Sequence, residues 1–112
     1  MRARRLSRRL VLEGAERVAD GSGGYADRWS SRGVLWAEVV AGTGREIGVD
    51  LVARERVGLR IMVRGAPAGA PSRPIAGQRF REGARIYPII AVAEADPEGR
   101  YLVCYAEEGG RG

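Results

Sequence analysis

The side chains that most often carry enzyme chemistry are nearly absent from this chain of 112 residues. It contains no His and no Lys, so all 19 basic residues are Arg, and its single Cys is Cys104. Without His, the commonest general base and the usual transition-metal ligand are missing. Without Lys, Schiff-base chemistry is missing, and a single Cys makes neither an intrachain disulfide nor a multi-cysteine zinc site. The sequence therefore predicts a protein that is not an enzyme and that uses no metal or cofactor.

The chemistry that remains is that of the guanidinium group, which binds phosphates and carboxylates. The formal net charge is +5, and the first nine residues contain five Arg and no acidic residue. This basic arm comprises Arg2, Arg4, Arg5, Arg8 and Arg9. Two interpretations are open: the arm contacts phosphates or an acidic protein surface, or it is a solvated terminus that leads into a strand. We expect residues 1–5 to be flexible.

A second group of charged residues lies in the segment 42–56. Thr43 and Glu46 have the spacing of a capping box, and Ile47 and Leu51 recur at helical spacing. This pattern predicts a short helix within a long connection between strands. Such connections often carry function, although a helix that plugs one end of a barrel would show the same pattern. The charged candidates in this segment are Arg45, Glu46, Asp50, Arg54 and Arg56.

Short strands must position these groups. Six segments have strand-like patterns: residues 6–13, 34–41, 57–64, 78–82, 85–93 and 100–107. The run 57–64 alternates most clearly, whereas 34–41 is apolar on both faces, which fits a central strand or one whose outer face meets a partner subunit. Pro88 argues for an edge position or a bulge in its strand. The fold class is therefore all-β: a small six-stranded antiparallel barrel or sandwich with one short helix in a long loop.

The segments between these strands are expected to be irregular. Residues 14–33 and 65–77 are predicted to be loops, and residues 108–112 a flexible tail. Trp29 is expected to cover the edge of the core, with partner anchoring as the alternative, and Cys104 to be a half-buried strand residue. The length fits one domain, residues 1–112, and no apolar run approaches the ~20 residues of a membrane span. The apolar run at residues 10–12 is also too short for a signal peptide, so we expect synthesis in the cytoplasm.

Several weak motifs follow one another in a characteristic order across residues 5–107. They are the basic start through Leu12, the group Asp20, Gly23-Gly24-Tyr25 and Trp29, the strand at Val34–Val39, Gly44-Arg45-Glu46, the strand at Val57–Arg64, the run Tyr87–Val92, and a closing strand at Leu102. In this order the sequence resembles the head–tail joining proteins of tailed bacteriophages. These are also called head completion or stopper proteins, and they occur in phage-like gene transfer agents as well.

The resemblance implies a structural role. Such proteins form a ring, typically of six copies, below the portal and adaptor proteins of a virion or gene transfer agent particle assembled in the bacterial cytoplasm. The ring closes the DNA channel, holds double-stranded DNA without reading its sequence, and docks the tail through the tail terminator protein. On this basis the charged residues of 42–56 are candidates for a gate in the channel. Trp36 and Met62 are candidates for the contact between copies.

Two other interpretations remain. A small basic β-barrel that binds nucleic acid would use the same arm and fold class, but it predicts aromatic residues interleaved with Arg on an exposed face. Most of the aromatic residues here occupy core-like strand positions. A tail terminator or tail completion protein of the same particle would share size and ring symmetry, so only the order of the motifs distinguishes it.

Overall fold

The computed structural model describes residues 5–42 and 56–109, and the side chain of Arg56 is not described. These residues form six strands: β1 (Arg8–Ala19), β2 (Tyr25–Gly42), β3 (Arg56–Arg64), β4 (Arg79–Glu82), β5 (Arg85–Glu94) and β6 (Tyr101–Gly109). The prediction of an all-β fold is confirmed. The predicted helix falls on residues 43–55, outside the described part of the chain. No helix able to cross a bilayer is found among the residues described.

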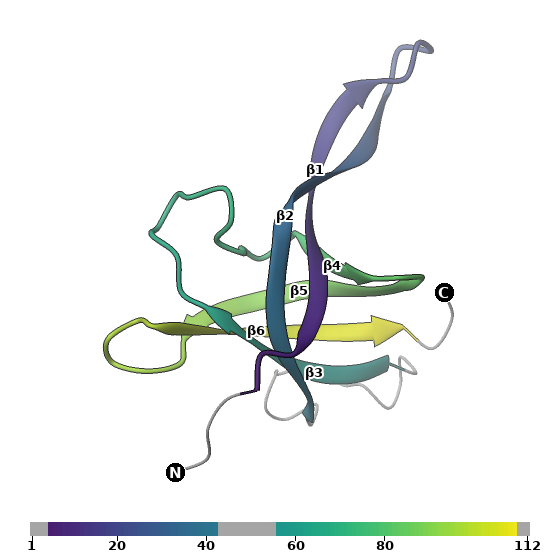
Figure 1. The fold of residues 1–112 in the computed structure, drawn as a ribbon. Helices are drawn as coiled ribbons and strands as arrows, with labels where there is room; N and C mark the ends of the chain where they lie inside the picture. The colour runs from purple at the N-terminus through teal and green to yellow at the C-terminus, as the bar shows by residue number, and fades with distance from the viewer. Residues whose placement is uncertain (1–4, 43–55, 110–112) are drawn as a thin grey trace.

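The strands form one closed barrel in the order β1-β2-β3-β6-β5-β4, and all neighbouring strands are antiparallel (Figure 1). Closure joins β4 back to β1 through a short ladder that runs only from Val11 to Glu13 on β1. A closed barrel leaves few strand edges open, which suits a chain too small to cover edges with helices.

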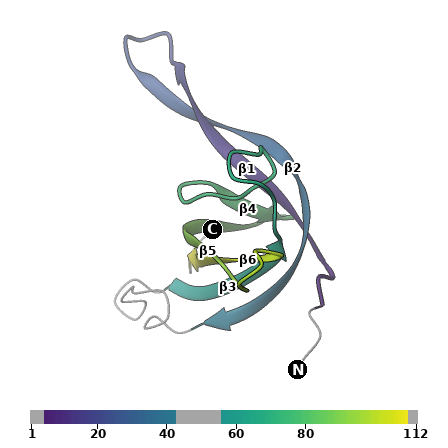
Figure 2. The same ribbon diagram turned by 90° about the vertical axis from the view of Figure 1, so that its left-hand side faces the viewer.

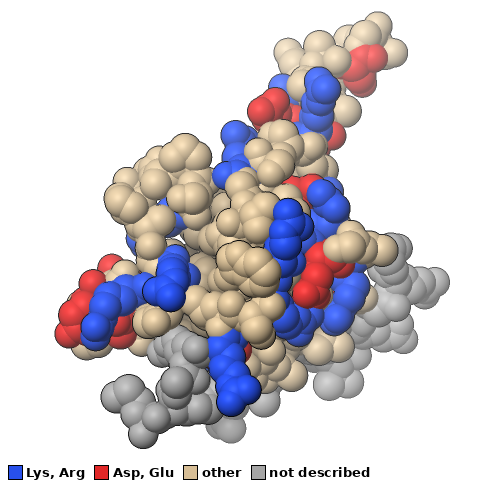
Figure 3. Space-filling model, in the orientation of Figure 1, with Lys and Arg blue, Asp and Glu red and all other residues tan. Residues whose placement is uncertain are grey.

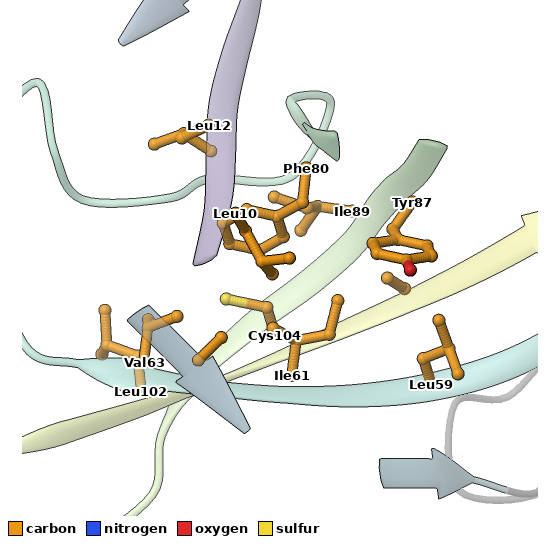
Figure 4. Close-up of a cluster of buried hydrophobic side chains, with 12 residues drawn as sticks. Leu10, Leu12, Leu59, Ile61, Val63, Phe80, Tyr87, Ile89, Leu102 and Cys104 are labelled. Carbon is orange, nitrogen blue, oxygen red and sulfur yellow. The ribbon is translucent and has the colours of Figure 1, made fainter. Parts of the chain in front are cut away.

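Alternating apolar residues fill the barrel. On β3 the side chains of Leu59, Ile61 and Val63 are buried, as the alternation predicts. The other large buried side chains come from β1, β4, β5 and β6, and Figure 4 shows them converging between the strands: Leu10, Leu12, Phe80, Tyr87, Ile89, Leu102 and Cys104. β2 contributes the small side chain of Ala37. Cys104 is fully buried rather than half-buried, so it belongs to the centre of this core.

The prediction of a loop over residues 14–33 is wrong. β1 continues to Ala19 and β2 begins at Tyr25, so that only residues 20–24 form a turn. The two strands are paired along this whole length. The strands were missed because most residues of this part of the chain are polar or small and exposed to solvent, so the apolar alternation that marks a half-buried strand does not arise.

This extra length makes a hairpin that leaves the barrel. Figures 1 and 2 show residues 14–31, here called the projecting hairpin, extending away from the other strands in both views. The overall extents are 55 × 35 × 24 Å. At its base the ladder shifts between Leu12 and Glu13, where β2 carries the extra residue Arg32 beside Gly33 at φ 139°. Such a bulge bends and twists a strand, so the hairpin leaves the barrel in a different direction from the strands below it.

The strands β4, β5 and β6 follow the sequence-based expectations, except at the C-terminal end. β4 and β5 pair as a hairpin. The β5–β6 register shifts between Ile89 and Ala91, next to Pro88, which is the bulge of the two predicted alternatives. The turn after β5 is closed by Gly99 N, which donates to Asp96 O at 3.1 Å. The predicted flexible tail begins too early, since β6 continues through Gly109 by pairing with β3.

Candidate assembly surfaces

Most of the predicted gate residues fall in the segment between β2 and β3. Arg45, Glu46, Asp50 and Arg54 are outside the described residues, and Arg56 is the first residue of β3. The chain leaves β2 at Gly42 and returns in β3, where Gly42 pairs with Gly58. Both ends of the connecting segment are therefore fixed side by side. They lie at the end of β2 opposite to the projecting hairpin (Figure 1).

The basic arm is divided by the structure. Arg2 and Arg4 lie outside the described residues, and Arg5 and Arg9 are exposed. Arg8 does not belong to a free arm, because it lies in β1 and binds Glu82 of β4 with two of its nitrogens, its Nε donating at 3.0 Å. For Arg8 the structure favours the second interpretation of the arm, a terminus that leads into a strand. The sequence left both interpretations open because the carboxylate partner of Arg8 lies 74 residues away.

A row of ion pairs closes the barrel where β1 meets β4. Glu13 is almost buried and accepts from Arg79 Nε and Arg81 Nε, both at 2.8 Å. Burial alone would raise the pKa of Glu13, but the two hydrogen bonds outweigh it and lower that pKa. The short ladder between β1 and β4 is thus reinforced by charge-assisted bonds on its outer side.

Glu82 forms a separate ion pair at the end of β4, on the strand face that also carries Phe80. Its carboxylate accepts from Arg8 and from Tyr87 Oη, the latter at 2.7 Å. The hydrogen bond from Arg8 lowers the pKa of Glu82 to about 2, although burial acts in the opposite direction. Burial and the hydrogen bond to Glu82 raise the pKa of Tyr87 to about 12. Tyr87 therefore stays protonated and acts as a structural donor.

Arg side chains on the barrel surface are paired with acids in other places too. Arg85 binds Glu108 through two hydrogen bonds of 2.9 Å, which lowers the pKa of Glu108. Arg100 binds Asp96 and Glu98. Figure 3 shows blue and red side chains next to one another over the barrel and along the projecting hairpin. These paired guanidinium groups hold the barrel together instead of forming a continuous basic surface.

The two predicted contact residues lie on the outside of the barrel. Trp36 is 54% exposed, and with Val34 it borders a surface hollow of about 270 Å³, here called the Trp36 hollow. Arg64, Ala66 and Ser72 also line it.

Met62 lines a second hollow, of about 350 Å³, here called the Met62 hollow. Its larger apolar side chains are Val40, Met62, Val103 and Tyr105. Its charged side chains are Glu38, Arg60 and Glu94. The structure therefore places Trp36 and Met62 in different hollows, both of which are large enough to take a side chain from a partner.

The projecting hairpin exposes aromatic residues that are further functional candidates. Tyr25 is 66% exposed, and the guanidinium of Arg17 lies over its ring, 4.9 Å from the centroid. Trp29 is half-buried against Arg79, whose guanidinium lies 4.0 Å from its ring centroid, and it is not part of the core cluster. The expectation that Trp29 covers the core is therefore wrong. Tyr25 and Trp36 are both exposed, and for Trp36 this agrees with its choice as a candidate contact residue.

The thiol of Cys104 is poorly placed to act as a nucleophile. Cys104 is fully buried, and burial raises the pKa of its thiol to about 12, so it stays protonated near neutral pH. Within residues 5–42 and 56–109, no cluster of three or more acidic or Cys side chains could hold a metal ion. The described surface instead offers hollows, an exposed hairpin and paired charges, which are features of an assembling protein.

A model of the phage head completion protein family matches residues 1–109. The chain belongs to this family. It is 51% identical to a chain in the virion of a native gene transfer agent particle, with 96% of this chain and 97% of that chain covered and a TM-score of 0.75. A solution structure of a Shigella flexneri 2a protein, 22% identical with both chains covered in full and a TM-score of 0.71, shares the fold. A comparison with curated protein sequences gives no match.

These findings confirm the resemblance that the order of motifs indicated. As a head completion protein, the chain is a virion component with a structural role in joining head and tail. It therefore assembles with other structural proteins of its particle.

Proposed function

We propose that copies of this head completion protein form a ring, typically of six, below the portal and adaptor proteins. The ring closes the DNA channel after packaging and presents its other side to the tail terminator protein. The neighbour from a gene transfer agent virion supports a particle of that kind or of a tailed phage. A ring arises when one surface patch of each copy binds a different patch of the next, and the outer face with Trp36 and Met62 supplies candidate patches.

The gate is the segment between β2 and β3. The observation that carries this assignment is the Gly42–Gly58 pairing, which fixes both ends of the segment at one end of the barrel. Cyclic symmetry would then repeat Arg45, Arg54 and Arg56 around the axis, with all copies of any one residue at the same height. Such rings of guanidinium groups bind phosphates without reading sequence. Glu46 and Asp50 would pair with Arg of the neighbouring copy and hold the gate segments together.

Several Arg residues of the barrel are already bound by acidic side chains, which supports the assignment of DNA contacts to the gate. Arg8, Arg79 and Arg81 are held by Glu82 and Glu13, so they stabilise the closed barrel. Contacts with packaged DNA are therefore assigned to the basic residues outside these ion pairs.

The test is DNA retention by particles that carry Arg45→Glu, Arg54→Glu or both. Particles are purified from producing cells, and the DNA that survives nuclease treatment is measured, with tail attachment scored by electron microscopy. We expect protected DNA to fall in each single variant and further in the double variant. Arg100→Glu is the matched control, because it makes the same charge change on the exposed turn before β6.

The outcomes separate two parts of the proposal. Full retention of DNA by the double variant overturns the gate assignment. If the protein is missing from purified wild-type particles, or is present there without cyclic symmetry at the head–tail junction, the ring itself is overturned.

A further inference from the structure

The projecting hairpin has two unlike faces. Residues directly opposite each other in the ladder share a face, so Arg17, Tyr25, Asp27 and Trp29 lie on one face. This aromatic face carries both aromatic residues of the hairpin, each with an Arg stacked on its ring. Glu16 and Arg28 lie opposite each other on the other face, which carries no aromatic residue.

The hairpin is ordered by local bonds rather than by a core. At its tip Asp20 Oδ1 accepts from the backbone N–H of Ser22 at 2.8 Å and of Gly24 at 3.1 Å. An isolated two-stranded hairpin is at best marginally stable in water, so a projecting hairpin with an exposed Tyr25 gains from a surface that covers it. Cation–π stacking already orders the Arg17 and Tyr25 side chains, which lowers the entropy lost on binding.

The Met62 hollow has the matching chemistry. Its volume of about 350 Å³ is about ten times the ~30 Å³ share of one water molecule, so it can admit a side chain. Met62 and Tyr105 offer thioether and ring surfaces to an aromatic residue. Glu94 complements Arg17 in charge. By contrast, Arg64 in the Trp36 hollow matches Arg17 poorly.

The positions of the two features suit a head-to-tail contact. Tyr25 is the first residue of β2 and Glu38 lies near its other end, so roughly 40 Å of strand separates them at about 3.3 Å per residue. A hairpin this far from its own Met62 hollow is placed to reach the hollow of another copy. Because the two patches differ, their contact repeats around a ring rather than ending in a dimer.

We propose that the aromatic face of the projecting hairpin, with Arg17 and Tyr25, docks into the Met62 hollow of a second copy of this chain. This inference rests on the proposed ring and specifies its contact: Tyr25 inserts against Met62 and Tyr105, and Arg17 meets Glu94.

Disulfide trapping in purified particles tests the contact. The double variant Tyr25→Cys/Ala95→Cys places one thiol on the hairpin and one in the hollow. The native Cys104 does not compete, since it is buried and its pKa is raised to about 12. We expect oxidation to give a ladder of dimers, trimers and higher multimers on a non-reducing gel. The single variants lack the second partner and give no ladder.

A second trap locates the hairpin if the first fails. Tyr25→Cys/Ser72→Cys places the second thiol in the Trp36 hollow. A ladder from this pair with none from the Ala95 pair overturns the Met62 hollow as the docking site. Failure of both pairs, in particles whose images show a ring of this protein, overturns hairpin docking while the ring proposal stands. Failure to image a ring overturns both proposals.

Charge reversal supplies an independent readout. Arg17→Glu is expected to reduce incorporation of the protein into particles, and Glu94→Arg in the same chain is expected to restore part of it. Arg28→Glu is the matched control, because it makes the same change on the other face of the same hairpin. Equal losses from Arg17→Glu and Arg28→Glu, without rescue by Glu94→Arg, would overturn the contact.

Discussion

The barrel and the projecting hairpin share β1 and β2, but they are stabilised in different ways. Inside the barrel, Leu10 and Leu12 of β1 are completely buried, and the seam with β4 is held by ion pairs on Glu13 and Glu82. Beyond Glu13, the described part of the chain provides neither a third strand nor a core for the same two strands. One pair of strands thus provides a stable scaffold at one end and an exposed arm at the other.

This difference has a physical reason and a functional consequence. Burial of apolar surface, at roughly 25 cal/mol per Å², is the main source of stability, and only the barrel provides it. The hairpin contributes little to the stability of the monomer, so its sequence is free to serve contacts. Segments with few buried contacts are the ones that proteins use for binding. Breaking each region separately should therefore change different properties.

The largest expected effect comes from the core of the barrel. Phe80→Ala removes a completely buried ring on β4 and should lower the free energy of unfolding by about 3–5 kcal/mol. Urea denaturation followed by circular dichroism measures it. Phe80→Leu keeps much of the volume and should cost clearly less. If Phe80→Ala unfolded at the wild-type midpoint, the barrel core would not be the source of stability.

A smaller effect is expected at the seam. The pKa of Glu82 is lowered to about 2 from an ordinary value of 4.5. The carboxylate therefore stabilises the fold above pH 4.5, and this stabilisation is lost as the pH falls toward 2. Allowing for solvent screening of a side chain that is 26% exposed, it is on the order of 2 kcal/mol.

The variant Glu82→Gln tests the seam. It should be less stable than the wild type at pH 7 and should lose less further stability between pH 4.5 and 2. Thermal melts across this range measure both effects. Glu98→Gln, on the exposed turn, is the matched control and should follow the wild-type curve. Parallel curves for Glu82→Gln and the wild type would contradict the lowered pKa of Glu82.

The smallest effect is expected at the hairpin. Tyr25→Ala removes an exposed ring and its stacking with Arg17, so it should cost the monomer at most about 0.5–1 kcal/mol. The denaturation experiment used for Phe80→Ala measures it, and hydrogen exchange should show faster exchange in residues 14–31 than in the barrel strands. A loss comparable to that of Phe80→Ala would mean that the hairpin is part of the stabilising structure, and the contrast between the regions would fail.

Much of the barrel could be predicted from local patterns. The alternation of Leu59, Ile61 and Val63 indicated β3, because the residues that form this signal lie within a few positions of one another. The projecting hairpin could not be predicted in this way, since strands held mainly by backbone pairing carry no apolar alternation. The place of Trp29 was also missed, because its partner, Arg79, lies on a strand that is distant in the sequence.

The sequence by itself determined the chemistry available to this protein. With 19 Arg, no His and no Lys, the chain is suited to binding phosphates and carboxylates, and the order of its motifs indicated its family. The tertiary structure alone decided which Arg residues are already engaged: Arg8 and Glu82 are 74 residues apart in the chain and meet only when the barrel closes. It also decided that the hairpin projects and that Met62 lines a hollow. Both depend on strand register, which is fixed by pairing across the whole sheet rather than by neighbouring residues.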